Sequence, residues 1–240
     1  MLIRLEGEVE YHMNRIKLLV LKYVDRYRMA LQKDLLAMQY LAPLTKDYLP
    51  WSIAAMRPSS IVVVLNEIML NNKSSIVEFG GGLSTIYIAS LLRRLGGHVY
   101  TIEHDETWAN KTMDLLMRQE LASYVTMIHA PLSATSLSLS GSLWYNEDII
   151  RTQLENIKID LLIVDGPPAD DKSDKYVRYP ALPFVWNYLA EDHTIMLHDI
   201  IRAGEQEILS RWEREYKLNF ERRYRDGFIG VGRSRKALTV

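Results

Sequence analysis

A short apolar run that carries an acid and then meets three consecutive glycines constrains the fold of this chain more than any other feature. The run is Ser75–Phe79, and an apolar-periodic segment, Ile86–Leu95, begins soon after the glycines. Glycines allow a tight turn at positive φ and let a ligand approach the main chain without meeting a Cβ atom. A helix start offers free N–H groups. The pattern predicts a strand, a ligand-binding turn and a helix, with candidate ligand contacts at Glu78, Gly80, Gly81, Gly82, Ser84 and Thr85.

The turn lacks the features of two common nucleotide-binding loops. A phosphate-binding P-loop needs a lysine after its last glycine, and none is present here. The dinucleotide fingerprint needs a third glycine, and Thr85 stands in that place. The next predicted strand, Val99–Glu103, ends in a carboxylate. A carboxylate at that strand end is placed to accept both ribose hydroxyls of an adenosine ligand.

With these residues the chain resembles the class I S-adenosylmethionine (SAM)-dependent methyltransferases. Their first motif is acid-x-Gly-x-Gly, and their second strand ends in the ribose-binding acid. The resemblance covers about residues 50–232 and implies an α/β fold. It implies a Rossmann-like, doubly wound, mostly parallel seven-stranded sheet with a C-terminal antiparallel hairpin, for which Asp226-Gly227 is a strong turn signal. SAM is the implied methyl donor.

The resemblance extends to the adenosine end of the donor site. Glu103 and His104 follow the second strand, and the third predicted strand, Tyr124–His129, is followed by Ala130. Many methyltransferases place a polar group there against the adenine amine, and the backbone of Ala130 or the side chain of His129 would substitute for it. Trp108 either stacks on the adenine or belongs to the core.

Two further predicted strands end in acids, which places these acids at the same edge of the sheet. Ile159–Val164 is a continuous apolar run of the kind found in buried parallel strands, and it ends at Asp165-Gly166-Pro167-Pro168. The strand from Thr194 ends at His198 and Asp199. Adjacent parallel strands lie about 4.8 Å apart, so Asp165 and Asp199 are expected to converge. Two such carboxylates repel unless a cation or shared proton intervenes, and a bound Mg²⁺ is the economical solution.

The Asp-Gly-Pro-Pro motif sharpens the resemblance, because methyltransferases that act on small molecules and sugars carry it at this strand. Catechol-type and sugar O-methyltransferases hold their metal with an Asp at each strand end and a neighbouring Asp or Asn. Here the neighbours of Asp199 are His198 and Ile200, so the third oxygen ligand is missing. Two possibilities remain open: a metal at Asp165 and Asp199, or His198 or Asp199 as general base. His198 is otherwise a hydrogen-bonded histidine at a strand end.

Candidate substrate residues flank this edge. In related methyltransferases a segment equivalent to residues 49–58 closes over the substrate, which nominates Trp51, Met56 and Arg57; Trp51 otherwise packs under a loop. The charged stretch Asp170–Arg178 is expected to overhang the site, with Arg178 selecting the acceptor. Arg202, near the start of the last helix, is a further candidate.

Composition excludes several classes of protein. The formal net charge of −1 gives no global attraction to nucleic acid, and the chain has no Asn/Asp-Pro-Pro-Tyr/Phe motif of base methylases. There are no cysteines, hence no disulfides or thiolate zinc sites, which fits a cytoplasmic location. We find neither a signal peptide nor a membrane-spanning run. A small-molecule or carbohydrate substrate is expected.

The first part of the chain predicts one long amphipathic helix. Between Val9 and Met38, apolar residues recur at steps of three and four: Val9, Met13, Ile16, Val20, Val24, Tyr27, Leu31, Leu35 and Met38. This spacing is typical of a straight helix with one apolar face. The face either packs on its own domain or forms a homodimer contact. We expect a helical extension over residues 1–48 and a methyltransferase domain over residues 49–240.

Two other functions stay possible at this point. An NAD-dependent oxidoreductase of Rossmann type is disfavoured by the missing third glycine. A non-catalytic nucleoside-binding or dimerisation module would bind neither cofactor productively. The leading interpretation is a SAM-dependent O-methyltransferase for a small hydroxylated metabolite or sugar.

Overall fold

The computed structural model describes residues 2–169 and 174–239. The α-helices are α1 (Leu2–Leu41), α2 (Pro58–Leu70), α3 (Leu83–Leu95), α4 (Glu106–Arg118), α5 (Glu147–Leu154), α6 (Ala181–Val185) and α7 (Ala203–Tyr216). Single 3₁₀ turns cover Ala42–Leu44, Ala122–Tyr124 and Trp186–Tyr188. The strands are β1 (Ser75–Phe79), β2 (His98–Glu103), β3 (Val125–His129), β4 (Leu132–Ser133), β5 (Trp144–Tyr145), β6 (Ile159–Val164), β7 (Leu189–Leu197), β8 (Phe220–Arg223) and β9 (Ile229–Arg233).

Seven of these strands form one sheet in the order β3-β2-β1-β6-β7-β9-β8. The first five are parallel to one another, and β9 pairs antiparallel with both β7 and β8. The predicted fold class is therefore confirmed, including the C-terminal hairpin. The order reverses between β1 and β6, where the loops after two neighbouring strands diverge. Ligands bind at that point in open α/β sheets.

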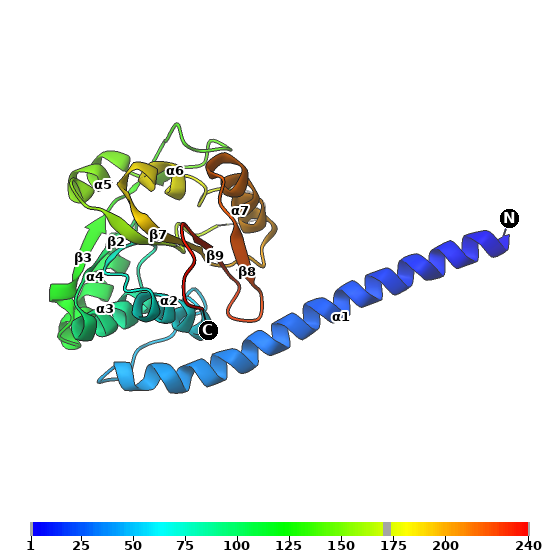
Figure 1. The fold of residues 1–240 in the computed structure, drawn as a ribbon, viewed down its shortest axis with the longest axis horizontal. Helices are drawn as coiled ribbons and strands as arrows, with labels where there is room; N and C mark the ends of the chain where they lie inside the picture. Colours follow the sequence, from blue (N-terminus) through cyan, green and yellow to red (C-terminus); the bar gives the residue numbers. More distant parts are fainter. Residues whose placement is uncertain (1, 170–173, 240) are drawn as a thin grey trace.

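Helices cover both faces of the sheet (Figure 1). The side chains of α2 and α3 pack on one face, with Ile61, Ile68 and Ile86 fully buried there. On the other face α5, α6 and α7 contribute Leu154, Leu182 and Trp212 to a second cluster. Burial on both faces explains why β1 and β6 are mostly apolar, with one acid each, and do not alternate between apolar and polar residues.

Three local expectations differ from the structure. Helix α3 starts at Leu83, so the helix begins directly after the glycine turn. Strand β7 starts at Leu189, earlier than the predicted start at Thr194, because the polar run Glu191-Asp192-His193 conceals the strand pattern. Helix α5 was not expected; Asn146 caps it by accepting the backbone N–H of Ile149 at 3.2 Å.

Helix α1 extends far beyond the domain (Figure 1). Only its C-terminal part packs on the domain, where it contacts α2 and where Ala30, Ala37 and Leu41 are buried. The apolar face named from the sequence is a different one. Its members from Met13 onward remain 38–74 % exposed: Met13, Ile16, Val20, Val24, Tyr27, Leu31, Leu35 and Met38. Tyr27 stacks on Phe228 with ring centroids 6.3 Å apart, but packing on its own domain leaves most of this face exposed.

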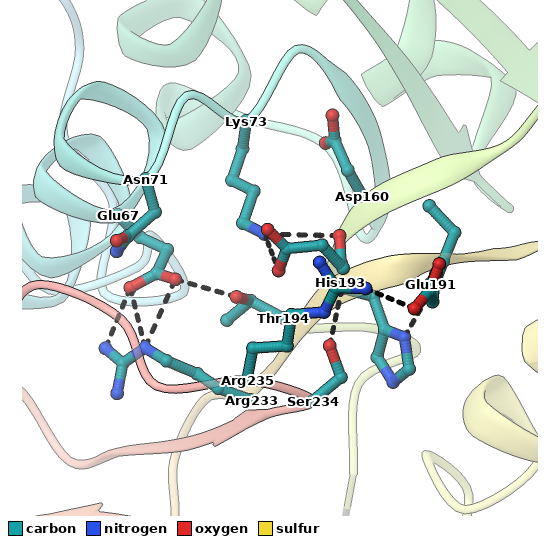
Figure 2. A network of polar contacts seen from close by, with 12 residues as sticks. Glu67, Asn71, Lys73, Asp160, Glu191, His193, Thr194, Arg233, Ser234 and Arg235 are labelled. Carbon is teal, nitrogen blue, oxygen red and sulfur yellow. Dashed lines mark hydrogen bonds and ion pairs between the residues drawn. The ribbon is translucent and has the colours of Figure 1, made fainter.

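A polar network fastens the sheet at the edge opposite the strand ends described below (Figure 2). The buried carboxylate of Glu67 on α2 accepts Arg233 Nη2 at 2.7 Å and Thr194 Oγ1 at 2.7 Å. Nearby, Lys73 Nζ contacts Asp192 Oδ1 at 2.9 Å. These bonds tie α2 to β7 and β9.

Among the described residues, no helix combines the length and apolarity that a bilayer crossing would need.

Candidate active site

A buried acid supports the glycine turn after β1 from the side of the core. Glu78 is fully buried and accepts hydrogen bonds from Thr85 Oγ1 at 2.5 Å and Thr101 Oγ1 at 3.0 Å. Thr85 Oγ1 in turn accepts the backbone N–H of Gly82 at 3.0 Å. Burial raises the pKa of Glu78 to about 7, although hydroxyl hydrogen bonds oppose the shift. Glu78, Ser84 and Thr85 therefore support the turn from the interior.

Glu103 lies at the end of β2 and faces the same turn. Its Oε2 accepts the backbone N–H of Gly81 at 3.2 Å, and its Oε1 accepts those of His104 and Asp105 at 2.7 and 3.0 Å. The His104 ring contacts Oε1 at 2.7 Å. Burial alone would raise the pKa of Glu103, but the bonds from His104 and Asp105 outweigh it and lower this pKa. An ionised carboxylate thus stands beside the glycines.

Trp108, on the first turn of α4, covers the solvent side of the glycine turn. Its Nε1 donates to the carbonyl oxygen of Gly81 at 2.7 Å, and the side chain is 37 % exposed. Asp105 caps α4 by accepting the Trp108 backbone N–H at 2.9 Å. The indole is thus a wall of the open site, and it does not belong to the core.

A cavity of about 360 Å³ opens between these elements. Its lining comes from the glycine turn, the β2–α4 loop and the loop after β6, and it includes Glu103, His104, Trp108 and Asp165. Its volume is in the usual range for pockets that enclose a cofactor-sized ligand. The ends of β1, β2 and β6 therefore meet at one rim, whereas His198 and Asp199 after β7 do not line this cavity.

Tyr145 is a lining residue that the sequence did not nominate. Its ring is fully buried and packs against Phe79 with ring centroids 5.5 Å apart. Tyr145 is among the residues that line the cavity, and its buried hydroxyl has no hydrogen-bond partner among the described residues. A buried, unpaired hydroxyl in a cavity is a group that a bound ligand can satisfy. The aromatic pair Trp144-Tyr145, just after a serine-rich stretch over residues 133–142, was the available signal.

The acids after β6 and β7 do converge. Asp165 Oδ1 lies 2.8 Å from His198 Nδ1, and Asp199 Oδ1 lies 3.5 Å from the same nitrogen. One ligand-type atom from each of these residues lies within 4.8 Å of those of the other two. Asp199 has a left-handed backbone, with φ of 63°, a conformation that Asp adopts more readily than most residues.

Two arginines enter the same cluster. Arg178 is 4 % exposed, with Nη2 3.4 Å from Asp165 Oδ1 and Nη1 3.5 Å from Asp199 Oδ2. Arg202 Nη2 lies 2.7 Å from Asp199 Oδ2 and 3.0 Å from Glu205 Oε1. The acid pair is therefore surrounded by guanidinium groups.

The pKa shifts in the cluster follow from these neighbours. Burial favours the neutral imidazole of His198, but the charges of Asp165 and Asp199 outweigh it and raise the pKa of His198. Burial would raise the pKa of Asp199, whereas His198, Arg178 and Arg202 lower it overall. Burial raises the pKa of Glu205 despite both arginines. The cluster therefore favours a charged imidazole between two carboxylates.

The segment nominated as a lid contributes unevenly to the site. Ser52 and Ala54 line the cavity, and the buried Met56 lies beside the glycine turn. Trp51 packs on Tyr87 of α3 with ring centroids 6.3 Å apart. Arg57 pairs with Asp34 of α1, so it anchors the long helix to the domain.

Other residues that the sequence predicted for the site do not line the cavity. Arg178 is buried under the acids, whereas the sequence placed it on an overhanging loop; residues 170–173 of that loop lie outside the described residues. Arg202 also donates to the carbonyl oxygen of Ala169 at 3.1 Å. Ala130 is buried, and its N–H donates to the carbonyl oxygen of Glu103 at 2.8 Å, so that N–H is engaged within the sheet.

Comparisons with known proteins agree with this geometry. The family described as "Methyltransferase domain" matches residues 77–200, and a search among curated proteins finds no match. The SAH-bound methyltransferase PaMTH1 of Podospora anserina superposes with a TM-score of 0.56 at 10 % identity, over 87 % of this chain and 88 % of that one.

Two O-methyltransferase structures are similar to a comparable extent. For TomG of Streptomyces achromogenes, involved in tomaymycin synthesis and solved with SAM, the TM-score is 0.52 at 16 % identity, over 85 % of this chain and 88 % of that one. For a Staphylococcus aureus protein provisionally named a caffeoyl-CoA O-methyltransferase, it is 0.55 at 14 % identity, covering 82 % and 90 %. At these identities the likeness concerns the fold.

Proposed function

The chain belongs to the methyltransferase-domain family, which matches more than half of it, and from that premise we propose that it transfers a methyl group from SAM to a hydroxyl of a small molecule or sugar. The observation that carries the proposal is the shared cavity. Glu103, the glycine turn and Asp165 line one space, so a donor and an acceptor can meet there. O-methylation also agrees with the names of the TomG and Staphylococcus aureus structures.

The residues of the cavity fit the nucleoside end of SAM. The carboxylate of Glu103 is ionised and faces the turn, so it accepts the ribose hydroxyls. Gly81 has no room for a side chain, since a Cβ there would lie 2.7 Å from Thr101 Cγ2. Trp108 and His104 provide flat walls for the adenine, and the unpaired hydroxyl of Tyr145 gains a partner from the bound donor.

The protein's own chemistry in this proposal is alignment and removal of a proton. SAM, when bound, supplies a methyl group already activated on a sulfonium, and its transfer leaves S-adenosylhomocysteine. As the acceptor oxygen bonds to the methyl carbon and the carbon–sulfur bond breaks, the proton of that oxygen passes to the carboxylate of Asp165, which His198 holds in place through its hydrogen bond at 2.8 Å. Of these two residues, Asp165 is the one that lines the cavity. The surrounding walls hold oxygen, carbon and sulfur in line.

A comparison of two ligands tests the proposal without knowledge of the acceptor. S-adenosylhomocysteine should raise the melting temperature of the protein, and NAD⁺ should leave it unchanged. Stabilisation by NAD⁺ alone would favour an oxidoreductase. A lack of response to both ligands would favour a non-catalytic module.

We further propose that two copies of the chain pair through α1. The supporting observation is the face of that helix from Met13 to Met38, whose side chains stay 38–74 % exposed even though Tyr27 stacks on Phe228. At about 1.5 Å per residue the face is roughly 38 Å long. Another helix of similar length covers such a face best, and a second α1 provides one. The contact is isologous if the two helices run antiparallel about Val20, which brings Ile16 opposite Val24 and Met13 opposite Tyr27.

A further inference from the structure

The guanidinium of Arg178 occupies a fixed position between the two acids. Besides its contacts with Asp165 and Asp199, its Nε donates to the carbonyl oxygen of Pro167 at 3.2 Å and its Nη1 to that of His198 at 3.3 Å. These carbonyls belong to the loops after β6 and β7. Because backbone atoms of both loops hold the guanidinium, it cannot swing aside without losing several buried hydrogen bonds.

The charges of the cluster are already balanced by side chains. Asp165, Asp199 and Glu205 face Arg178 and Arg202, with Arg178 Nη1 3.8 Å and Arg202 Nη2 3.0 Å from Glu205 Oε1. Three carboxylates therefore meet two guanidinium groups, besides the imidazole of His198. A divalent ion placed here would lie a few ångströms from two permanent positive charges, and this repulsion is strong in a buried site.

One oxygen of each acid that such an ion needs is also engaged. Asp165 Oδ1 is hydrogen-bonded to His198 Nδ1 at 2.8 Å, and Asp199 Oδ2 accepts Arg202 Nη2 at 2.7 Å. Mg²⁺ prefers six oxygen ligands in near-octahedral geometry, and the neighbours of Asp199 along the chain are His198 and Ile200. These residues do not fit a magnesium site.

We propose that Arg178 takes the place of a divalent metal: it neutralises Asp165 and Asp199 so that they share one small volume, and methyl transfer proceeds without a bound cation. This inference rests on the proposed function, because it concerns the acidic half of the same cavity. Arg178 is a positioning residue, since it acts through Asp165 and does not line the cavity. An arginine is suited to the task because it stays charged in a buried site.

The test uses Mn²⁺ as the probe and S-adenosylhomocysteine as the ligand. Free Mn²⁺ is counted by electron paramagnetic resonance in solutions of the full chain, with and without saturating S-adenosylhomocysteine. The wild-type protein should bind S-adenosylhomocysteine equally well in EDTA and in millimolar Mn²⁺, and should hold no stoichiometric Mn²⁺. Stoichiometric Mn²⁺ binding that Asp165→Asn abolishes would overturn the inference and leave the proposed function intact. Failure to bind S-adenosylhomocysteine would instead count against the proposed function.

Two variants test the role of Arg178 itself. Arg178→Gln removes the charge and leaves the two acids facing each other, so Mn²⁺ should raise its melting temperature while leaving that of the wild type unchanged. A folded Arg178→Gln variant that ignores Mn²⁺ would contradict the inference. Arg178→Lys keeps a positive charge and should remain unresponsive to Mn²⁺; stabilisation of this variant by Mn²⁺ would also contradict it.

Discussion

Gly80 and Gly166 lie back to back where β1 and β6 end. Gly80 has a φ of 91°, and a Cβ added there would lie 2.8 Å from the backbone nitrogen of Gly166. A Cβ on Gly166 would meet Gly80 Cα at 2.8 Å and would also collide with the Tyr145 hydroxyl. The backbones of the glycine turn and the acid-bearing loop are thus in direct contact, which fixes Asp165 beside the glycine turn.

This contact predicts a large cost for a single methyl group. Gly166→Ala should lower the free energy of unfolding by about 2 kcal/mol or more, because backbone atoms cannot yield as a flexible side chain can. Gly82→Ala is the matched control, since a Cβ there meets only ordinary contacts with Trp108 at 3.7 Å and beyond. Urea denaturation of both variants measures the difference. Equal stabilities would show that the loops do not pack as described.

The buried acid below the glycine turn makes stability depend on pH. Glu78 titrates at about 7 in the folded protein against 4.5 ordinarily. Below pH 4.5 it is protonated in both states; as the pH rises, the unfolded chain ionises first, so folding loses stability until the folded group also ionises near pH 7. At about 1.4 kcal/mol per pKa unit the loss reaches roughly 3 kcal/mol.

Glu78→Gln removes this titration. The unfolding free energy of the variant relative to wild type should therefore rise between pH 5 and pH 7 and level off above. Chemical denaturation at a series of pH values provides the comparison. A difference that stays constant across this range would mean that Glu78 is ionised in the folded protein.

The exposed face of α1 predicts a change of mass in solution. Val20→Glu places a charge at the centre of the proposed helix pair, where burying it would be costly, so the protein should become monomeric. Leu18→Glu lies on the opposite side of the helix and serves as the control. Sedimentation equilibrium of the wild type and both variants decides: a monomeric wild type, or a dimer that both variants retain, would exclude this contact.

The strand ends were predictable from sequence because apolar runs stop at them. Glu103 and Asp165 each follow such a run, and parallel strands bring their ends to one edge of the sheet. The engagement of Arg178 was not predictable. It lies in a charged stretch that reads as a surface loop, and only the packing of the loops after β6 and β7 directs its side chain inward.

Tyr145 and α1 show two other limits of sequence patterns. Tyr145 lies on a two-residue strand, which is too short to give a periodic signal. The spacing of apolar residues along α1 correctly predicted a helix, but spacing alone does not say what covers an apolar face. The domain instead packs on a neighbouring face of α1, where the small side chains of Ala30 and Ala37 are buried.

Calorimetric titration of S-adenosylhomocysteine into wild type and Glu103→Ala tests the central claim, that the cavity beside the glycine turn holds the methyl donor. The variant should bind about 1–3 kcal/mol more weakly, through lost hydrogen bonds to the ribose. Glu106→Ala, an exposed neighbour on the first turn of α4, should bind as the wild type does. A wild type that binds S-adenosylhomocysteine tightly and a folded Glu103→Ala variant of unchanged affinity would contradict the assignment of this cavity.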